Sequence, residues 1–192
     1  NNDGVNDNAY PIPNDHEGWG LIDLVNATDG TAEFVDNATG VSTGGSAQYQ
    51  YSVASSGAAL KISAVWSDYP SSTSANQNLV NDLDLEVTSP SGTVYRGNVF
   101  SGGWSQTGGT ADRLNNVENV YVQSAEAGTW TVVVKGYNTP YGPQAFALVI
   151  DGNLGTAPPT PTPTPEPTAQ PTATPATTDT PPPPEEPTPP PQ

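Results

Sequence analysis

Apolar and polar residues alternate with a period of two along much of the chain between Ala47 and Ile150. Such alternation puts one set of side chains on each face of an extended segment, so it predicts strands that bury one face. We expect strands at 48–53, 60–66, 83–88, 93–95, 117–122, 129–135 and 145–150, and one more near 32–35. Gly, Pro and Asn residues between them favour turns. The pattern predicts an all-β fold, a jelly-roll β-sandwich or barrel.

The two ends of the chain have a different composition. From Thr156 to Gln192 the residues are almost entirely Pro, Thr, Ala and Glu, with no aromatic or large aliphatic side chain. Such a segment cannot bury enough apolar surface to offset its ordering entropy, so we expect residues 154–192 to be a disordered Pro/Thr-rich linker or tail. Residues 29–153 form the expected β domain, and residues 1–28 end in a short helical segment around 17–25.

Charge and cysteine content exclude several function classes. Twenty Asp and Glu residues face four Lys and Arg, which gives a formal net charge of -16 and argues against a nucleic-acid partner. The chain has no cysteine, so it has no disulfide, thiolate metal site or cysteine nucleophile. No membrane span or signal peptide is visible in the sequence. The chain also lacks methionine, and we expect it to be a piece of a longer, processed protein.

A cluster of acids is the strongest chemical signal. In the 82–87 segment, Asp82, Asp84 and Glu86 share one face of the predicted strand. A half-buried strand with a solvated acidic face is one interpretation. The other is a calcium site, because adjacent carboxylates need a counter-charge and calcium prefers oxygen ligands. Asn78, Asn81 and backbone carbonyls would complete the shell. The loop at 112–119 offers the same chemistry a second time, with an ordinary Asn-rich turn as the alternative. The residues we select as calcium ligands are Asp82, Asp84, Asp112, Asn116 and Glu118.

Catalytic and sugar-binding signals are weaker. His16 is the only histidine, and there is no Gly-x-Ser-x-Gly motif, so no serine triad can be assembled from this chain and no catalytic residue is predicted. Trp66 and Trp130 fall within predicted strands and should be core residues. Trp104, in a glycine-rich stretch that we expect to be an exposed loop, is the candidate for stacking on a sugar.

Several motifs resemble those of subtilisin-like serine proteases (subtilases). The run 13–24, with Gly18-Trp-Gly20 followed by Leu-Ile-Asp-Leu, resembles the end of the subtilase catalytic domain. The rest resembles the C-terminal jelly-roll β-barrel of large alkaline subtilases, which is related to the P domain of kexin-like convertases. The matching motifs are at 60–68, 79–85, 89–93, 115–120, 127–130 and 137–144.

The resemblance implies the C-terminal part of a secreted, extracellular endopeptidase. Residues 1–28 would end the catalytic domain, and the β domain would bind calcium and stabilise that domain, its partner in the same polypeptide. Protein or peptide substrates would belong to the parent enzyme, since the family's triad lies upstream of the Gly-Trp-Gly segment. The alternative is an autonomous β-sandwich module that binds carbohydrate or protein and is displayed on the Pro/Thr-rich linker.

Overall fold

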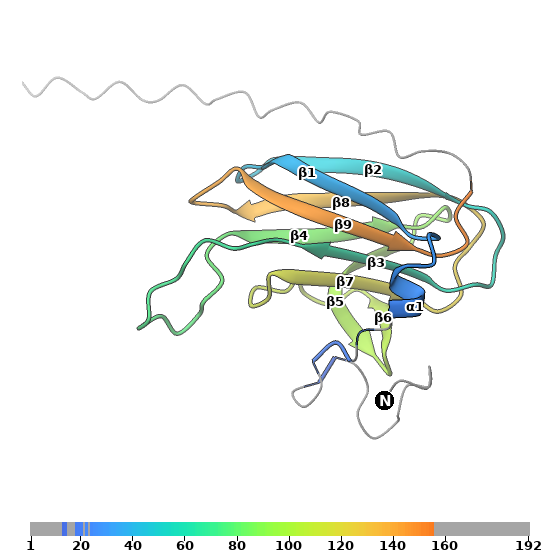
Figure 1. The fold of residues 1–192 in the computed structure, drawn as a ribbon, viewed down its shortest axis with the longest axis horizontal. Coiled ribbons are helices and arrows are strands. Elements are labelled where there is room, and N and C mark those ends of the chain that lie inside the picture. The colour runs from blue at the N-terminus through green and yellow to red at the C-terminus, as the bar shows by residue number, and fades with distance from the viewer. Residues whose placement is uncertain (1–12, 15–17, 21, 23, 156–192) are drawn as a thin grey trace, which may run out of the picture.

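The computed structural model describes residues 13–14, 18–20, 22 and 24–155. Within these residues the chain forms two antiparallel sheets that pack face to face as a β-sandwich (Figure 1). His16, much of the predicted helical segment and the Pro/Thr-rich segment from Thr156 onward lie outside the described residues.

The described elements are one short helix and nine strands. In chain order they are α1 (Leu24–Ala27), β1 (Glu33–Val41), β2 (Ser46–Val53), β3 (Leu60–Val65), β4 (Asp82–Thr88), β5 (Val94–Ser101), β6 (Trp104–Thr107), β7 (Val117–Val122), β8 (Gly128–Asn138) and β9 (Gln144–Asp151).

The strand order is that of a jelly roll. One sheet runs β1-β9-β3-β7 and the other β2-β8-β4-β5-β6. Apart from β6, the strands pair in nested fashion: β1 with β9, β2 with β8, β3 with β7 and β4 with β5. Nested antiparallel pairing across two sheets is the wrapping pattern of a jelly roll, and it confirms the all-β sandwich predicted from the alternation.

The core lies between the two sheets and follows the alternation of the strands. On β8, Trp130, Val132 and Val134 are at most 1% exposed, and Leu83, Leu85 and Val87 of the neighbouring strand β4 lie beside them on the same face of the sheet. Full burial of each such aliphatic side chain stabilises the fold by about 1.5–3 kcal/mol. Trp66 and Trp130 are both buried, as predicted.

Three elements differ most from the sequence-based expectation. Strand β1 extends to Val41 and β5 to Ser101, so both are longer than expected. The stretch expected to be an exposed loop contains β6, because Gly102 and Gly103 both adopt positive φ and close a two-residue hairpin between Ser101 and Trp104. Paired glycines favour this kind of turn, so they mark a hairpin and not a long loop.

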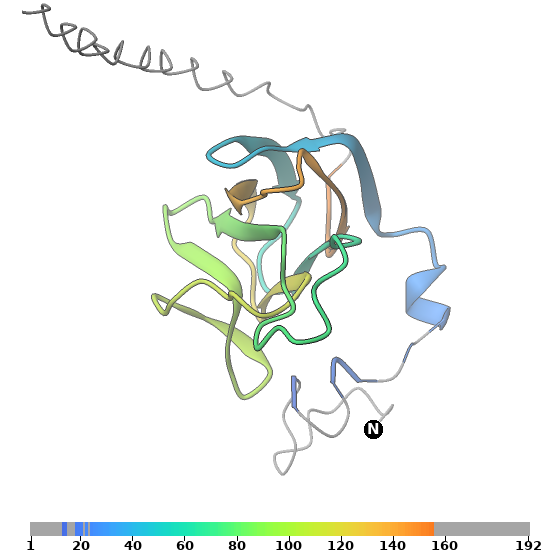
Figure 2. The ribbon, with the colours of Figure 1, turned by 90° about the vertical axis from the view of Figure 1, so that its left-hand side faces the viewer.

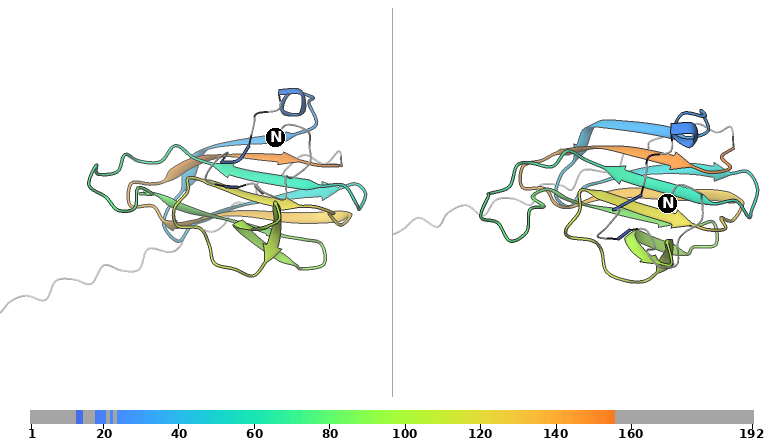
Figure 3. Two further views of the ribbon diagram at one scale, coloured as in Figure 1. Left: turned by 90° about the horizontal axis from the view of Figure 1, so that it is seen from below. Right: turned by 60° about the horizontal axis from the view of Figure 1, so that its bottom comes forward.

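The N-terminal segment and one long loop lie outside the sheets. Helix α1 begins at Leu24, near the end of the predicted helical range, and stands beside the sandwich and not within it (Figure 2). The loop between β3 and β4 extends beyond the strand ends (Figure 3). No described helix is long and apolar enough to span a membrane.

Candidate functional site

The predicted acidic cluster lies where two neighbouring strands separate. Strand β4 pairs with β8 along its length, but with β5 only from Glu86 to Thr88. The part of β4 before Glu86 therefore has one edge without a strand partner. There the buried side chain of Glu118, on β7 of the opposite sheet, accepts a hydrogen bond from the backbone N–H of Leu85 (Oε2–N 2.5 Å).

A glycine makes room for this carboxylate. Gly97 on β5 lies against the Glu118 side chain, and a Cβ atom at position 97 would overlap the carboxyl group. The bend of β5 away from β4, the absence of a side chain at Gly97 and the position of Glu118 on β7 thus form one local arrangement. It replaces a missing inter-strand hydrogen bond with one made by a side chain.

Burial is unfavourable for the charge of Glu118. Its side chain is 1% exposed, and burial raises the pKa of Glu118 to about 8, with smaller increases from Asp84, Asp112 and Asp82. The hydrogen bond from Leu85 acts in the opposite direction. Oε1 of Glu118 has no hydrogen-bond partner among the described residues. A buried oxygen without a partner is costly unless it is protonated or meets another ligand.

Arg113 is the counter-charge for the two aspartates on β4. Its guanidinium bonds Asp82 (Nη1–Oδ1 3.1 Å) and makes a bidentate pair with Asp84 (Nη2–Oδ2 3.2 Å). It also lies 3.6 Å from the centroid of the Tyr137 ring. Burial raises the pKa of Asp82 to about 6, although Arg113 opposes that rise. The repulsion between Asp82 and Asp84 predicted from their spacing is thus offset by an arginine.

The remaining predicted ligands already have partners. The carboxylate of Asp112 accepts hydrogen bonds from the amides of Asn98 and Asn115 and from the backbone N–H of Leu114. Burial opposes ionisation of Asp112, but these hydrogen bonds hold its pKa below the usual value. The amide of Asn116 donates to the carbonyl of Trp66 (2.8 Å).

The five predicted ligands are therefore brought to one region, but not into one coordination shell. Among the residues that the structure describes, no group of three or more His, Cys, Asp or Glu side chains is arranged to hold a metal ion. Calcium binding stays a prediction. The sequence reasoning overlooked Arg113, although it stands next to Asp112 in the selected loop.

Asn81, predicted to complete a calcium shell, instead joins two loops. Its buried side chain bonds both the N–H (3.1 Å) and the carbonyl (3.2 Å) of Tyr141, and donates to Oε1 of Gln144 (2.7 Å). Its backbone N–H donates to Asp68, which also accepts from the N–H of Tyr69. The rings of Tyr69 and Tyr141 stack above this network, with centroids 4.0 Å apart and planes inclined by 5°.

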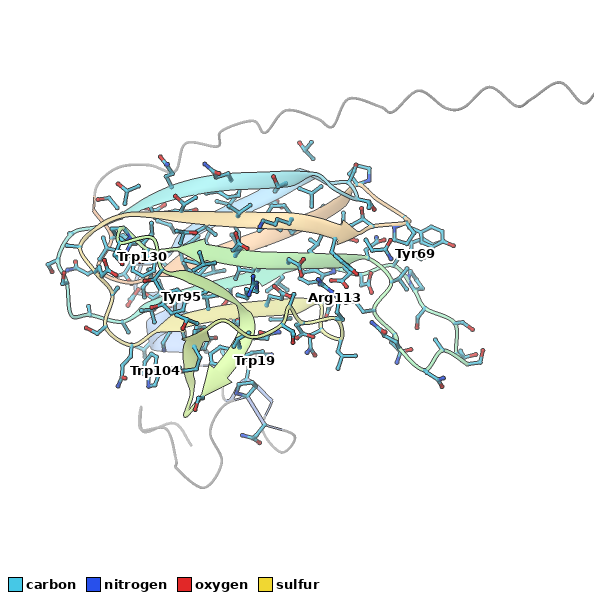
Figure 4. The ribbon with its side chains drawn as sticks, turned by 180° about the vertical axis from the view of Figure 1, so that it is seen from behind. Trp19, Tyr69, Tyr95, Trp104, Arg113 and Trp130 are labelled. Atoms are coloured by element: carbon cyan, nitrogen blue, oxygen red, sulfur yellow. The ribbon has the colours of Figure 1, made fainter. Side chains whose placement is uncertain are left out.

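Trp104 does not lie on an exposed loop. It is half-buried at the start of β6, and the label in Figure 4 places it toward the opposite end of the sandwich from Tyr69. Trp19 instead packs edge-to-face against Phe100 and Tyr121, with centroids 5.7 and 6.3 Å away. This contact fixes the Gly18-Trp-Gly20 segment on the side of β5 and β7.

Fold and site together define a jelly-roll β-sandwich with a partly buried acidic cluster in which an arginine pairs with two aspartates. No family model matches the chain. Its sequence is similar to three curated proteins of Dictyostelium discoideum, named serine protease/ABC transporter B family protein tagB, tagD and tagA. The identities are 38% over 96 residues (47% of this chain), 34% over 99 residues (47%) and 30% over 119 residues (60%). The chain spans only about 5–7% of the length of these relatives.

Proposed function

We propose that this chain is the C-terminal β region of a secreted subtilisin-like serine endopeptidase. The observation that supports the proposal is its similarity to three proteins whose names include "serine protease". The jelly-roll strand order is consistent with the P-domain-like module that the motifs at 60–68 and 137–144 resemble. In this proposal the parent enzyme cleaves peptide bonds by acyl-enzyme chemistry, with a triad supplied by another part of the polypeptide.

The chain itself should not hydrolyse peptides. A serine triad needs a histidine base, and the only histidine in the sequence is His16, on the wrong side of the family's catalytic serine. The test is to assay the purified chain and the parent enzyme on the same casein and peptide substrates. Activity in the parent alone supports the proposal, whereas hydrolysis by the chain, abolished by a serine-reactive fluorophosphonate, would contradict it.

We further propose that the β region binds calcium and stabilises the catalytic domain. The support is electrostatic: Asp82, Asp84, Asp112 and Glu118 place four carboxyl groups in one region, and Arg113 forms ion pairs with two of them, Asp82 and Asp84. Oε1 of Glu118 adds a buried oxygen without a hydrogen-bond partner among the described residues. Calcium would supply positive charge there and would accept these oxygens as ligands.

Thermal unfolding of the chain with excess calcium, excess magnesium or chelator tests this proposal. An ion that binds only the folded state raises the unfolding midpoint as its concentration rises. We expect calcium to raise the midpoint in the wild type and less so in Asp84→Asn, whereas Glu33→Gln, a change at an exposed acid on β1, should behave as the wild type. Identical midpoints in calcium and chelator would refute calcium binding.

In the alternative, an autonomous binding module, Trp104 is a weaker candidate for stacking on a sugar. That side chain is half-buried in β6, so it offers less ring surface than the sequence led us to expect. An exposed aromatic surface lies elsewhere.

A further inference from the structure

Two stacked tyrosines form an exposed aromatic surface at one end of the sandwich. Tyr69, in the β3–β4 loop, is 47% exposed, and Tyr141, in the β8–β9 loop, is 60% exposed. Each ring uses one face for the stack, with centroids 4.0 Å apart, and much of the remaining ring surface is in solvent. We call Tyr69 and Tyr141 the tyrosine ledge; Figure 4 places Tyr69 beyond the strand ends.

The ledge is held rigidly by buried polar groups. Asn81 is 1% exposed and bonds the backbone of Tyr141 through both ends of its amide. The carboxylate of Asp68 accepts from the N–H groups of Tyr69, Val80 and Asn81 at 2.7 Å each. The ledge therefore loses little conformational freedom when a ligand binds, which favours affinity.

Apart from Asp68, the segments 68–81 and 136–150 that carry the ledge contain no charged residue, although the molecule is strongly acidic. Neither 69–81 nor 136–150 contains an Asp, Glu, Lys or Arg residue, against 24 such residues in the whole chain. Residues 37–60, which include the β1–β2 loop bonded to Thr139 through Thr43, are also free of them. The charge of Asp68 is directed at backbone N–H groups and not at solvent partners.

The side chains beside the ledge are rich in hydroxyl and amide groups. Residues 71–78 of the β3–β4 loop read Ser-Ser-Thr-Ser-Ala-Asn-Gln-Asn, and nearly all of them are exposed. Hydroxyl and amide groups both donate and accept hydrogen bonds, as sugar hydroxyls do. A flat ring surface beside neutral donors and acceptors fits a ligand with an apolar ring face and a hydroxylated rim. Residues 71–78 themselves offer no charge to a charged partner.

We propose that the tyrosine ledge binds a neutral saccharide, which stacks on the exposed ring surface while the 71–78 loop hydrogen-bonds its hydroxyl groups. The proposal does not depend on the calcium site or on the protease assignment. It differs from sugar binding at Trp104 in its residues and in its end of the sandwich.

Affinity electrophoresis of the full chain tests the proposal. Native gels would contain a mixed-linkage β-glucan, a galactomannan or an arabinoxylan, with polygalacturonate as the anionic control. We expect at least one neutral polysaccharide to retard the wild type and polygalacturonate to have no effect. Tyr69→Ala/Tyr141→Ala should weaken binding at least about tenfold, whereas Tyr69→Phe/Tyr141→Phe and Trp104→Ala should retain most of it.

Thermal unfolding of each variant would establish that the alanine pair remains folded. Lack of retardation by every neutral polysaccharide, or equal retardation of the wild type and the alanine pair, would overturn the proposal. So would retardation by the anionic polymer alone. If the ledge binds a protein partner and none of the saccharides, the ledge is a protein interface, and that outcome also overturns the proposal.

Discussion

The carboxylate of Glu118 on β7 accepts a hydrogen bond from the backbone N–H of Leu85 on β4, across the interface between the two sheets. Both residues are 1% exposed. The bond lies at the part of β4 that does not pair with β5. The Glu118 side chain, which comes from the other sheet, therefore takes the place of a strand partner there. The pKa of a buried carboxyl group, the packing between the sheets and the separation of β5 from β4 all bear on this contact.

Glu118 should make stability fall as pH rises. Its pKa in the folded state is about 8, above the usual value of 4.5, so the folded state retains a proton that the unfolded state releases between these values. Stability is therefore greatest below about pH 4.5 and declines up to about pH 8, by roughly 3–5 kcal/mol at most for this group. Glu118→Gln keeps an acceptor oxygen for Leu85 and should remove that component. Urea unfolding of both proteins in chelator across this range measures it, and parallel pH profiles would show that Glu118 does not carry it.

Gly97→Ala should destabilise the fold through Glu118. The new methyl group would overlap the Glu118 carboxylate, and overpacking of this kind costs about 1–3 kcal/mol. Gly155→Ala is the matched control, because neither glycine has a positive φ and the nearest atom at Gly155 is 3.5 Å away, an ordinary contact. In a double-mutant cycle with Glu118→Ala, the cost of Gly97→Ala should shrink. Additive losses would mean that the two positions do not interact.

Asn81→Ala should loosen the tyrosine ledge as well as destabilise the fold. The substitution removes three hydrogen bonds and leaves buried groups of Gln144 and Tyr141 without them, which costs about 2–4 kcal/mol. Near-ultraviolet circular dichroism should report the altered packing of Tyr69 on Tyr141. Asn78→Ala, at an exposed amide bonded to Ser71, is the control. An unchanged aromatic spectrum in Asn81→Ala would show that the ledge does not need this network.

The alternation of side chains explains why most of the fold was predictable. Buried residues of β3, β4, β8 and β9 recur at every second position, so the sequence of these strands predicts which face packs in the core. The glycine-rich stretch at 101–109 predicts an exposed loop, whereas Gly102 and Gly103 form the turn of a hairpin. Paired glycines are equally suited to a two-residue turn, and local sequence alone does not distinguish the two.

The candidate site was less predictable because its contacts join distant segments. Asp82 and Asp84 were recognised as a pair that needs positive charge, but the partner, Arg113, comes 29 residues after Asp84. The polar network at Asn81 spans 60 residues to Tyr141. Composition identifies carboxylates and amides, whereas only the folded topology decides whether such groups bind each other or a ligand.

Arg113→Gln should destabilise the fold in chelator and increase its response to calcium. The change leaves Asp82, whose side chain is 9% exposed, without its cationic partner, and breaking a partly buried pair costs roughly 1–3 kcal/mol at neutral pH. The pKa of Asp82 is about 6, above the usual value of 3.8, so the contribution of this group to stability falls as pH rises between these values. Without Arg113 the pKa of Asp82 rises further, because the aspartate ionises less readily. The decline in stability then continues to a higher pH. The cost of Arg113→Gln should therefore be small near pH 4 and largest above pH 6.

The calcium response separates two roles for the arginine. If a cation binds at Asp82 and Asp84, Arg113 competes with it, and calcium should raise the unfolding midpoint more in Arg113→Gln than in the wild type. Arg96→Gln removes the same charge from a side chain that bonds the carbonyl of Gly109, and it should respond to calcium as the wild type does. Equal calcium responses in all three proteins would contradict competition at these aspartates. No response in any of them would leave Arg113 as the permanent counter-charge of the cluster.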